Sequence, residues 1–146
     1  MTESKLRTQS MDFAVSIIEL VKDLKGKRES IISNQIGRSG TSIGANIREA
    51  QYAHGKADFI AKLQIALKEA SETGYWLELL YRTQYIDQAH YQRLDSACTS
   101  IRVMLVASIR TAKERTHDLI LERFGCSGPS SQAPHRLYRG RNTPHL

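Results

Sequence analysis

The chain has 146 residues, of which 40% are apolar and 25% charged, and its formal net charge is +6. That length fits one domain of roughly 100 to 200 residues. No stretch comes near the ~20 consecutive apolar residues of a membrane-spanning helix. The N-terminus lacks the basic start and apolar run of a signal peptide, so we expect a cytoplasmic protein with no membrane partner. Two cysteines, Cys98 and Cys126, are too few for a disulfide framework or a metal cluster.

The first two predicted helices differ in their apolar faces. The first ends at Gly26, a helix stop preceded by lysines. Its apolar residues recur at helical spacing, with three of them widening the stripe: Leu6, Phe13, Ala14, Ile17, Ile18, Leu20, Val21 and Leu24. The second runs from about residue 30 to 52, where Ser39, Gly40 and Gly44 interrupt the apolar face. These small residues weaken a helix but let a neighbouring backbone come close.

The last two predicted helices complete an antiparallel bundle. The third spans about 57–84, and Asp87 is a good N-cap for the fourth. The fourth helix has an unbroken alternation of spacings of four and three, through Tyr91, Leu94, Cys98, Ile101, Leu105, Ser108 and Ala112. All prolines lie beyond residue 128, so no proline breaks these helices. We predict an all-α, antiparallel up-down four-helix bundle over residues 1–124, followed by a flexible, disordered or partner-dependent C-terminal tail over residues 125–146.

Several short motifs between residues 38 and 86 occur together in a recognisable order. They are Ser42-Ile43, Ala45-Asn46-Ile47, Glu49-Ala50, Ala57-Asp58-Phe59-Ile60, Ile65-Ala66-Leu67-Lys68-Glu69-Ala70, Glu72-Thr73 and Tyr75-Trp76-Leu77. Asp12-Phe13-Ala14-Val15 on the first helix agrees with them. This pattern resembles the bacterial four-helix-bundle proteins encoded in intervening sequences of large-subunit ribosomal RNA genes. The resemblance covers about residues 4–120 and omits the tail.

The resemblance implies an antiparallel bundle, ring-shaped homopentamers and no assigned enzymatic activity. A related branch of such bundles serves retroelement reverse transcriptases as accessory proteins, with a basic surface that binds nucleic acid. Gly55 departs from the pattern, because a hydroxyl residue often caps the third helix in these proteins. We expect this departure to affect the turn and not the fold.

Four polar residues of helices two and three are candidates for a shared layer. Glu69 and Glu72 lie one turn apart, and Asn46 or Glu49 could face them across the bundle. We interpret Asn46, Glu49, Glu69 and Glu72 as a structural, hydrogen-bonded polar layer within or between subunits. Glu114 and His117 form a single Glu-x-x-His pair, whereas a di-metal bundle uses two such pairs and two further glutamates. We therefore expect no metal.

Other chemistry-bearing residues indicate binding rather than catalysis. Cys98 has no histidine one turn away, and the chain contains no phosphate-binding Gly-x-x-x-x-Gly-Lys motif. Candidate nucleic-acid-binding residues are Arg102, Arg110 and Lys113, which share one stripe, and Arg136, Arg139 and Arg141 of the tail. That stripe could instead be an ordinary solvated helix face. Candidate subunit-interface residues are Tyr75, Trp76 and Tyr81.

Two functional hypotheses follow from these observations. The first is a non-enzymatic bundle without cofactors that forms a cyclic homo-oligomer, expected to be a pentamer. The second is an accessory factor that holds RNA or DNA on a basic surface of the assembled ring, where repetition makes weak contacts multivalent.

Overall fold

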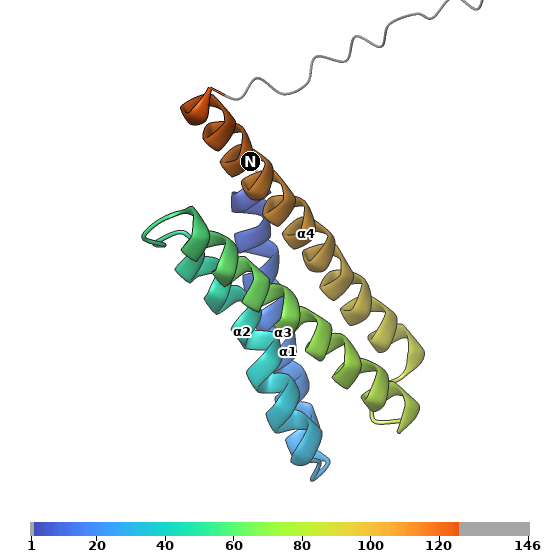
Figure 1. The fold of residues 1–146 in the computed structure, drawn as a ribbon. Helices are drawn as coiled ribbons and strands as arrows, with labels where there is room; N and C mark the ends of the chain where they lie inside the picture. The colour runs from blue at the N-terminus through green and yellow to red at the C-terminus, as the bar shows by residue number, and fades with distance from the viewer. Residues whose placement is uncertain (1, 126–146) are drawn as a thin grey trace, which may run out of the picture.

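Four long helices, packed as an antiparallel bundle, make up the computed structural model, which describes residues 2–125 (Figure 1). They are α1 (Thr2–Gly26), α2 (Ile31–Ala50), α3 (Lys56–Arg82) and α4 (Gln88–Phe124). Each helix packs against the next one in the chain, and α4 returns to α1 and closes the bundle. The predicted all-α four-helix bundle is confirmed. Of the predicted tail, only Gly125 lies among the described residues.

The bundle core follows the predicted apolar faces, with one exception. Ile17, Ile36, Ile43, Leu77 and Leu105 are completely buried and represent all four helices. Ile18, which we expected to widen the core face of α1, is 42% exposed, so this prediction is wrong. Successive helical residues are rotated by about 100°, and the burial of Ile17 and Leu20 turns Ile18 outward.

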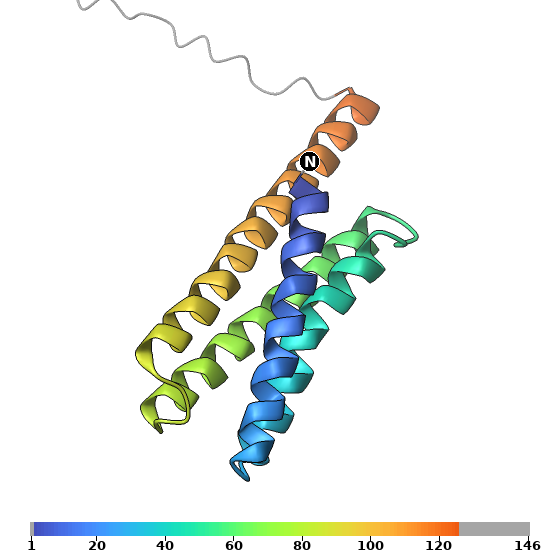
Figure 2. The same ribbon diagram turned by 180° about the vertical axis from the view of Figure 1, so that it is seen from behind.

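The helix α4 is longer than its neighbours, and its last turns project past the loop that joins α2 and α3 (Figures 1 and 2). Leu119, Ile120 and Phe124 in this projection are all more than half exposed. The N-terminus of α1 lies beside the preceding part of α4 in both views. None of the helices between residues 2 and 125 has the length and apolar character that crossing a membrane requires.

Side chains cap two of the helix starts. Asp87 caps α4 as predicted, because its Oδ1 accepts a hydrogen bond of 2.8 Å from the His90 amide. At the start of α2, Ser30 makes no side-chain cap. Glu29 takes this role instead, since its two carboxylate oxygens accept hydrogen bonds from the amides of Ile32 and Ser33 at 2.9 and 2.8 Å. This buried carboxylate satisfies two amides that the helix itself leaves unpaired.

The helices α1 and α2 approach closely along the small residues predicted from the sequence. A Cβ atom at Gly40 would lie 2.9 Å from both Cγ atoms of Ile17, and one at Gly44 would lie 3.4 Å from the Ser10 carbonyl oxygen. No side chain fits at Gly40 without movement of Ile17, which is itself completely buried. Glycine at this position therefore sets the distance between the two helices.

We predict that Gly40→Ala destabilises the protein, whereas Gly74→Ala stabilises it. The added methyl at residue 40 collides with the rigid base of a buried side chain, which costs about 1–3 kcal/mol and outweighs the roughly 1 kcal/mol gain in helix propensity. At Gly74 a Cβ atom meets nothing within 4 Å, so only the gain remains. Urea unfolding of both variants measures the difference. Equal stabilisation by the two substitutions would contradict the close contact.

Candidate functional site

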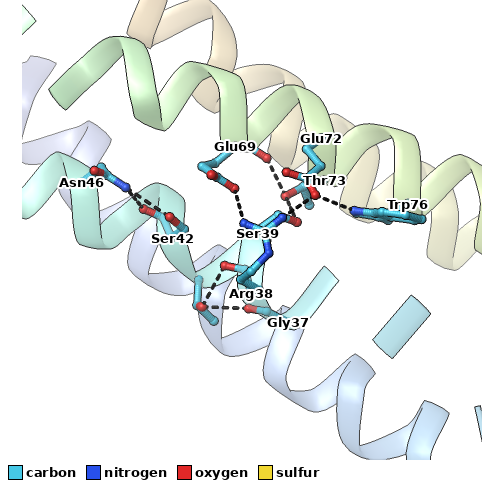
Figure 3. Close-up of polar contacts among 10 residues, drawn as sticks. Gly37, Arg38, Ser39, Ser42, Asn46, Glu69, Glu72, Thr73 and Trp76 are labelled. Carbon is cyan, nitrogen blue, oxygen red and sulfur yellow. Dashed lines mark hydrogen bonds and ion pairs between the residues drawn. The ribbon is translucent and has the colours of Figure 1, made fainter. Parts of the chain in front are cut away.

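A partly buried ion-pair cluster joins α2 and α3 (Figure 3). Arg38 of α2 donates to Glu69 at 3.2 Å between Nη1 and Oε2, and its Nη2 donates to Glu72 Oε1. The indole Nε1 of Trp76 donates to the same Glu72 oxygen at 3.2 Å. The hydrogen bond from Arg38, followed by that from Trp76, lowers the pKa of Glu72 against the opposing effect of desolvation. One guanidinium thus holds two carboxylates that lie one helical turn apart.

A buried hydroxyl pair lies beside this cluster. Thr73 Oγ1 is 2.8 Å from Ser39 Oγ and 2.8 Å from the Glu69 carbonyl oxygen. Both hydroxyl-bearing residues are completely buried. Because neighbouring residues of α2 and α3 supply both features, the hydroxyl pair and the ion-pair cluster fix the register of these two helices together.

The four residues predicted as a polar layer are not joined to one another within the chain. Glu69 and Glu72 share Arg38, whereas Asn46 donates to the Ser42 carbonyl of its own helix at 2.9 Å, away from the cluster (Figure 3). Glu49 is in an ion pair with Lys62 at 2.9 Å. A layer between subunits stays a prediction. Arg38 was not predicted as the partner of Glu69 and Glu72; the signal for it is their spacing of three, which places two carboxylates within reach of one cation.

The predicted interface aromatics have partners within the chain. Tyr75 is 58% exposed, and its ring meets Trp76 edge to face, with 4.9 Å between the ring centroids. Tyr81 stacks on Tyr91 of α4 at 4.9 Å. Trp76 packs against the core as well as bonding Glu72. Of the three, Tyr75 leaves the largest surface for another molecule, and its role in a subunit interface stays a prediction.

The thiol of Cys98 is built into the core. It donates to the Ala70 carbonyl oxygen of α3 at 3.2 Å. Burial raises the pKa of Cys98 to about 11, so the thiol stays protonated at neutral pH and is a poor nucleophile. In the part of the chain that the structure describes, no three His, Cys, Asp or Glu side chains gather as a metal-binding group. Cys126 lies outside that part.

Two of the predicted basic residues line an apolar groove between α3 and α4. Arg102 and Arg110 lie along it, and Lys113 is exposed one turn further on. The groove, which we call the α3–α4 groove, is lined by Leu67, Ser71, Arg102, Val103, Val106, Ala107 and Arg110. Among residues 2–125, no ion pair involves Arg102, Arg110 or Lys113. The predicted Arg136, Arg139 and Arg141 lie outside the described residues.

Comparison with known proteins finds similarity to one protein family and to solved structures. The sequence profile of the family described as 23S rRNA-intervening sequence protein matches residues 2–107. A crystal structure of a protein with unknown function, from the S23 ribosomal protein family of Bacteroides thetaiotaomicron VPI-5482, is 50% identical in sequence. The match covers 75% of this chain and 99% of that chain, with a TM-score of 0.74. No curated protein matches the chain.

We predict that Arg38→Gln destabilises the protein at neutral pH and much less in acid. The pKa of Glu72 is lower in the folded chain than its ordinary value of 4.5, so its ionised form stabilises the fold above that pH. This contribution is lost as the pH falls through the lower, folded-state pKa. Urea unfolding at about pH 7 and about pH 2.5 measures the difference between wild type and variant.

Arg82→Gln is the control, because it removes an exposed pair with Glu78 within α3. Both side chains of that pair are largely in solvent, so a smaller loss is expected. An Arg38→Gln effect that is equal at both pH values, or no larger than that of Arg82→Gln, would argue against a stabilising cluster.

Proposed function

The chain belongs to the 23S rRNA-intervening sequence protein family, and on this premise we propose that it is a non-enzymatic bundle that assembles with copies of itself into a ring. The expected ring is a pentamer, by resemblance to this kind of bundle. The function of the ring is then to present the same outer surface once in every subunit.

Exposed apolar side chains on the outer faces of the bundle carry the proposal. Met11, Val15 and Ile18 of α1 are 47%, 52% and 42% exposed and lie at spacings of four and three, which places them on one side of the helix. We call them the α1 stripe. Val103 and Val106 of the α3–α4 groove are 64% and 42% exposed. Contiguous apolar surface of this kind, rimmed by polar residues, marks contacts with other proteins.

The ion pairing and burial of the polar groups support a role without catalysis. Arg38 is paired with both Glu69 and Glu72 across two helices. Cys98 is buried and protonated, which is the opposite of what a nucleophile needs. The side chains best suited to chemistry are thus engaged in holding α2, α3 and α4 together.

A second candidate function is the binding of RNA or DNA. It is favoured by the row of Arg102, Arg110 and Lys113, since none of the three is in an ion pair within the described chain. Side chains whose charge is not already neutralised can contact phosphates, and a ring repeats the row in every subunit.

We predict that size-exclusion chromatography with light scattering gives a molar mass several times that of one chain. A pentamer has five times the mass of the single chain. A single-chain mass that persists as the protein concentration is raised would exclude the ring.

The second function predicts that the affinity for a labelled single-stranded RNA falls steeply with salt. The logarithm of the binding constant changes by about 0.7 per phosphate contact for each unit in the logarithm of salt concentration. Lys113→Glu removes such a contact and reduces the slope by about that amount. Arg82→Glu makes the same charge change on α3, where Arg82 is paired with Glu78, and leaves the slope unchanged. Salt-independent binding, or equal effects of both variants, would refute this function.

A further inference from the structure

The α3–α4 groove has a guanidinium at each end and valines between them. Arg102, Val106 and Arg110 follow one another at spacings of four on α4, so they lie along one side of the helix. Eight residues of helix separate the two arginines by about 12 Å. Val103 and Ala107 widen the apolar floor, and Leu67 of α3 forms the opposite wall.

This composition suits a protein partner better than a nucleic-acid backbone. A phosphate chain gains nothing from the valines, which are 64% and 42% exposed at Val103 and Val106. An apolar centre with arginine at its edge is typical of protein–protein contacts, because arginine combines bidentate pairing with weak hydration. The matching partner is a helix that has apolar side chains between two carboxylates separated by about 10–12 Å.

The outer face of α1 has this pattern along its edge toward α4, where Asp12 and Glu19 lie on the same side as Arg93. Asp12, Val15 and Glu19 follow at spacings of three and four, so seven residues separate the two carboxylates by about 10 Å, with Val15 between them. Met11 and Ile18 of the α1 stripe lie beside Val15 and add to its apolar surface. Asp12 and Glu19 are exposed, and neither is in an ion pair within residues 2–125.

We propose that the α1 stripe of one copy of this chain, with Asp12 and Glu19 at its edge, docks into the α3–α4 groove of the next copy. The valines meet at the centre, and the two carboxylates pair with Arg102 and Arg110. This inference rests on the proposed ring and names the surfaces that close it.

The contact is head-to-tail, because it joins two different surfaces of the chain. A copy that uses its groove still has its α1 stripe free for the next copy. Head-to-tail contacts of this kind form a ring when the rotation between copies closes. They also occupy Arg102 and Arg110, which are then withdrawn from nucleic acid.

Charge exchange tests the contact in the full-length chain. We expect R102E/R110E and D12K/E19K, each of which makes both surfaces the same sign, to fall from the ring mass to the single-chain mass in light scattering. The four substitutions combined exchange the charges, keep the net charge of the wild type, and restore the ring mass. V106D, at the centre of the groove, gives a second route to the single chain. Circular dichroism confirms that each variant is helical.

The swap E78R/R82E is the control, because it exchanges an exposed ion pair within α3 outside both surfaces and leaves the ring mass unchanged. Double variants that keep the ring mass would overturn this contact while leaving the ring itself intact. Single-chain double variants that the combined substitutions do not rescue would overturn the pairing of the two surfaces. A single-chain mass of the wild type would instead refute the ring on which the inference rests.

Discussion

The bundle depends on one turn of α2 that contacts helices on two sides. Gly40 has no side chain, so the turn can lie against the buried Ile17 of α1. The two residues before it are rotated by about 100° each, and they meet α3 instead. There Ser39 contacts the hydroxyl of Thr73, and Arg38 binds the carboxylates of Glu69 and Glu72. Packing on one side and polar pairing on the other thereby set the positions of three helices at one level of the bundle.

The number, limits and antiparallel order of the helices could be predicted from the sequence because they depend on local patterns. Apolar periodicity, the Asp87 cap and the small residues of α2 all act within a few residues of chain. The cap formed by Glu29 was not predicted, and Ser30, the commoner cap residue by type, makes no side-chain cap. Glu29 reaches the amides of α2 because the backbone reverses direction at Arg28, whose φ is 63°. This conformation depends on the geometry of the whole loop between α1 and α2.

The candidate sites were less predictable because they depend on how two helices are aligned. Glu69 and Glu72 could be placed on one face of α3, but the residue opposite them is set by the register of α2 against α3. Asn46 lies two turns, or about 12 Å, from the observed partner Arg38. The row containing Arg102 and Arg110 was likewise visible in the sequence. The groove beside this row was not, because its opposite wall is formed by Leu67 of another helix, α3.

The buried thiol of Cys98 can serve as a kinetic probe of the bundle interior. Alkylating reagents attack the thiolate, and with a pKa of about 11 almost none of this group is ionised at neutral pH. Its hydrogen bond to the Ala70 carbonyl also ties it to α3, so a reagent reaches the sulfur only when α3 and α4 separate. The rate of Cys98 modification therefore reports how often this helix pair opens, which is a local stability that global unfolding does not resolve.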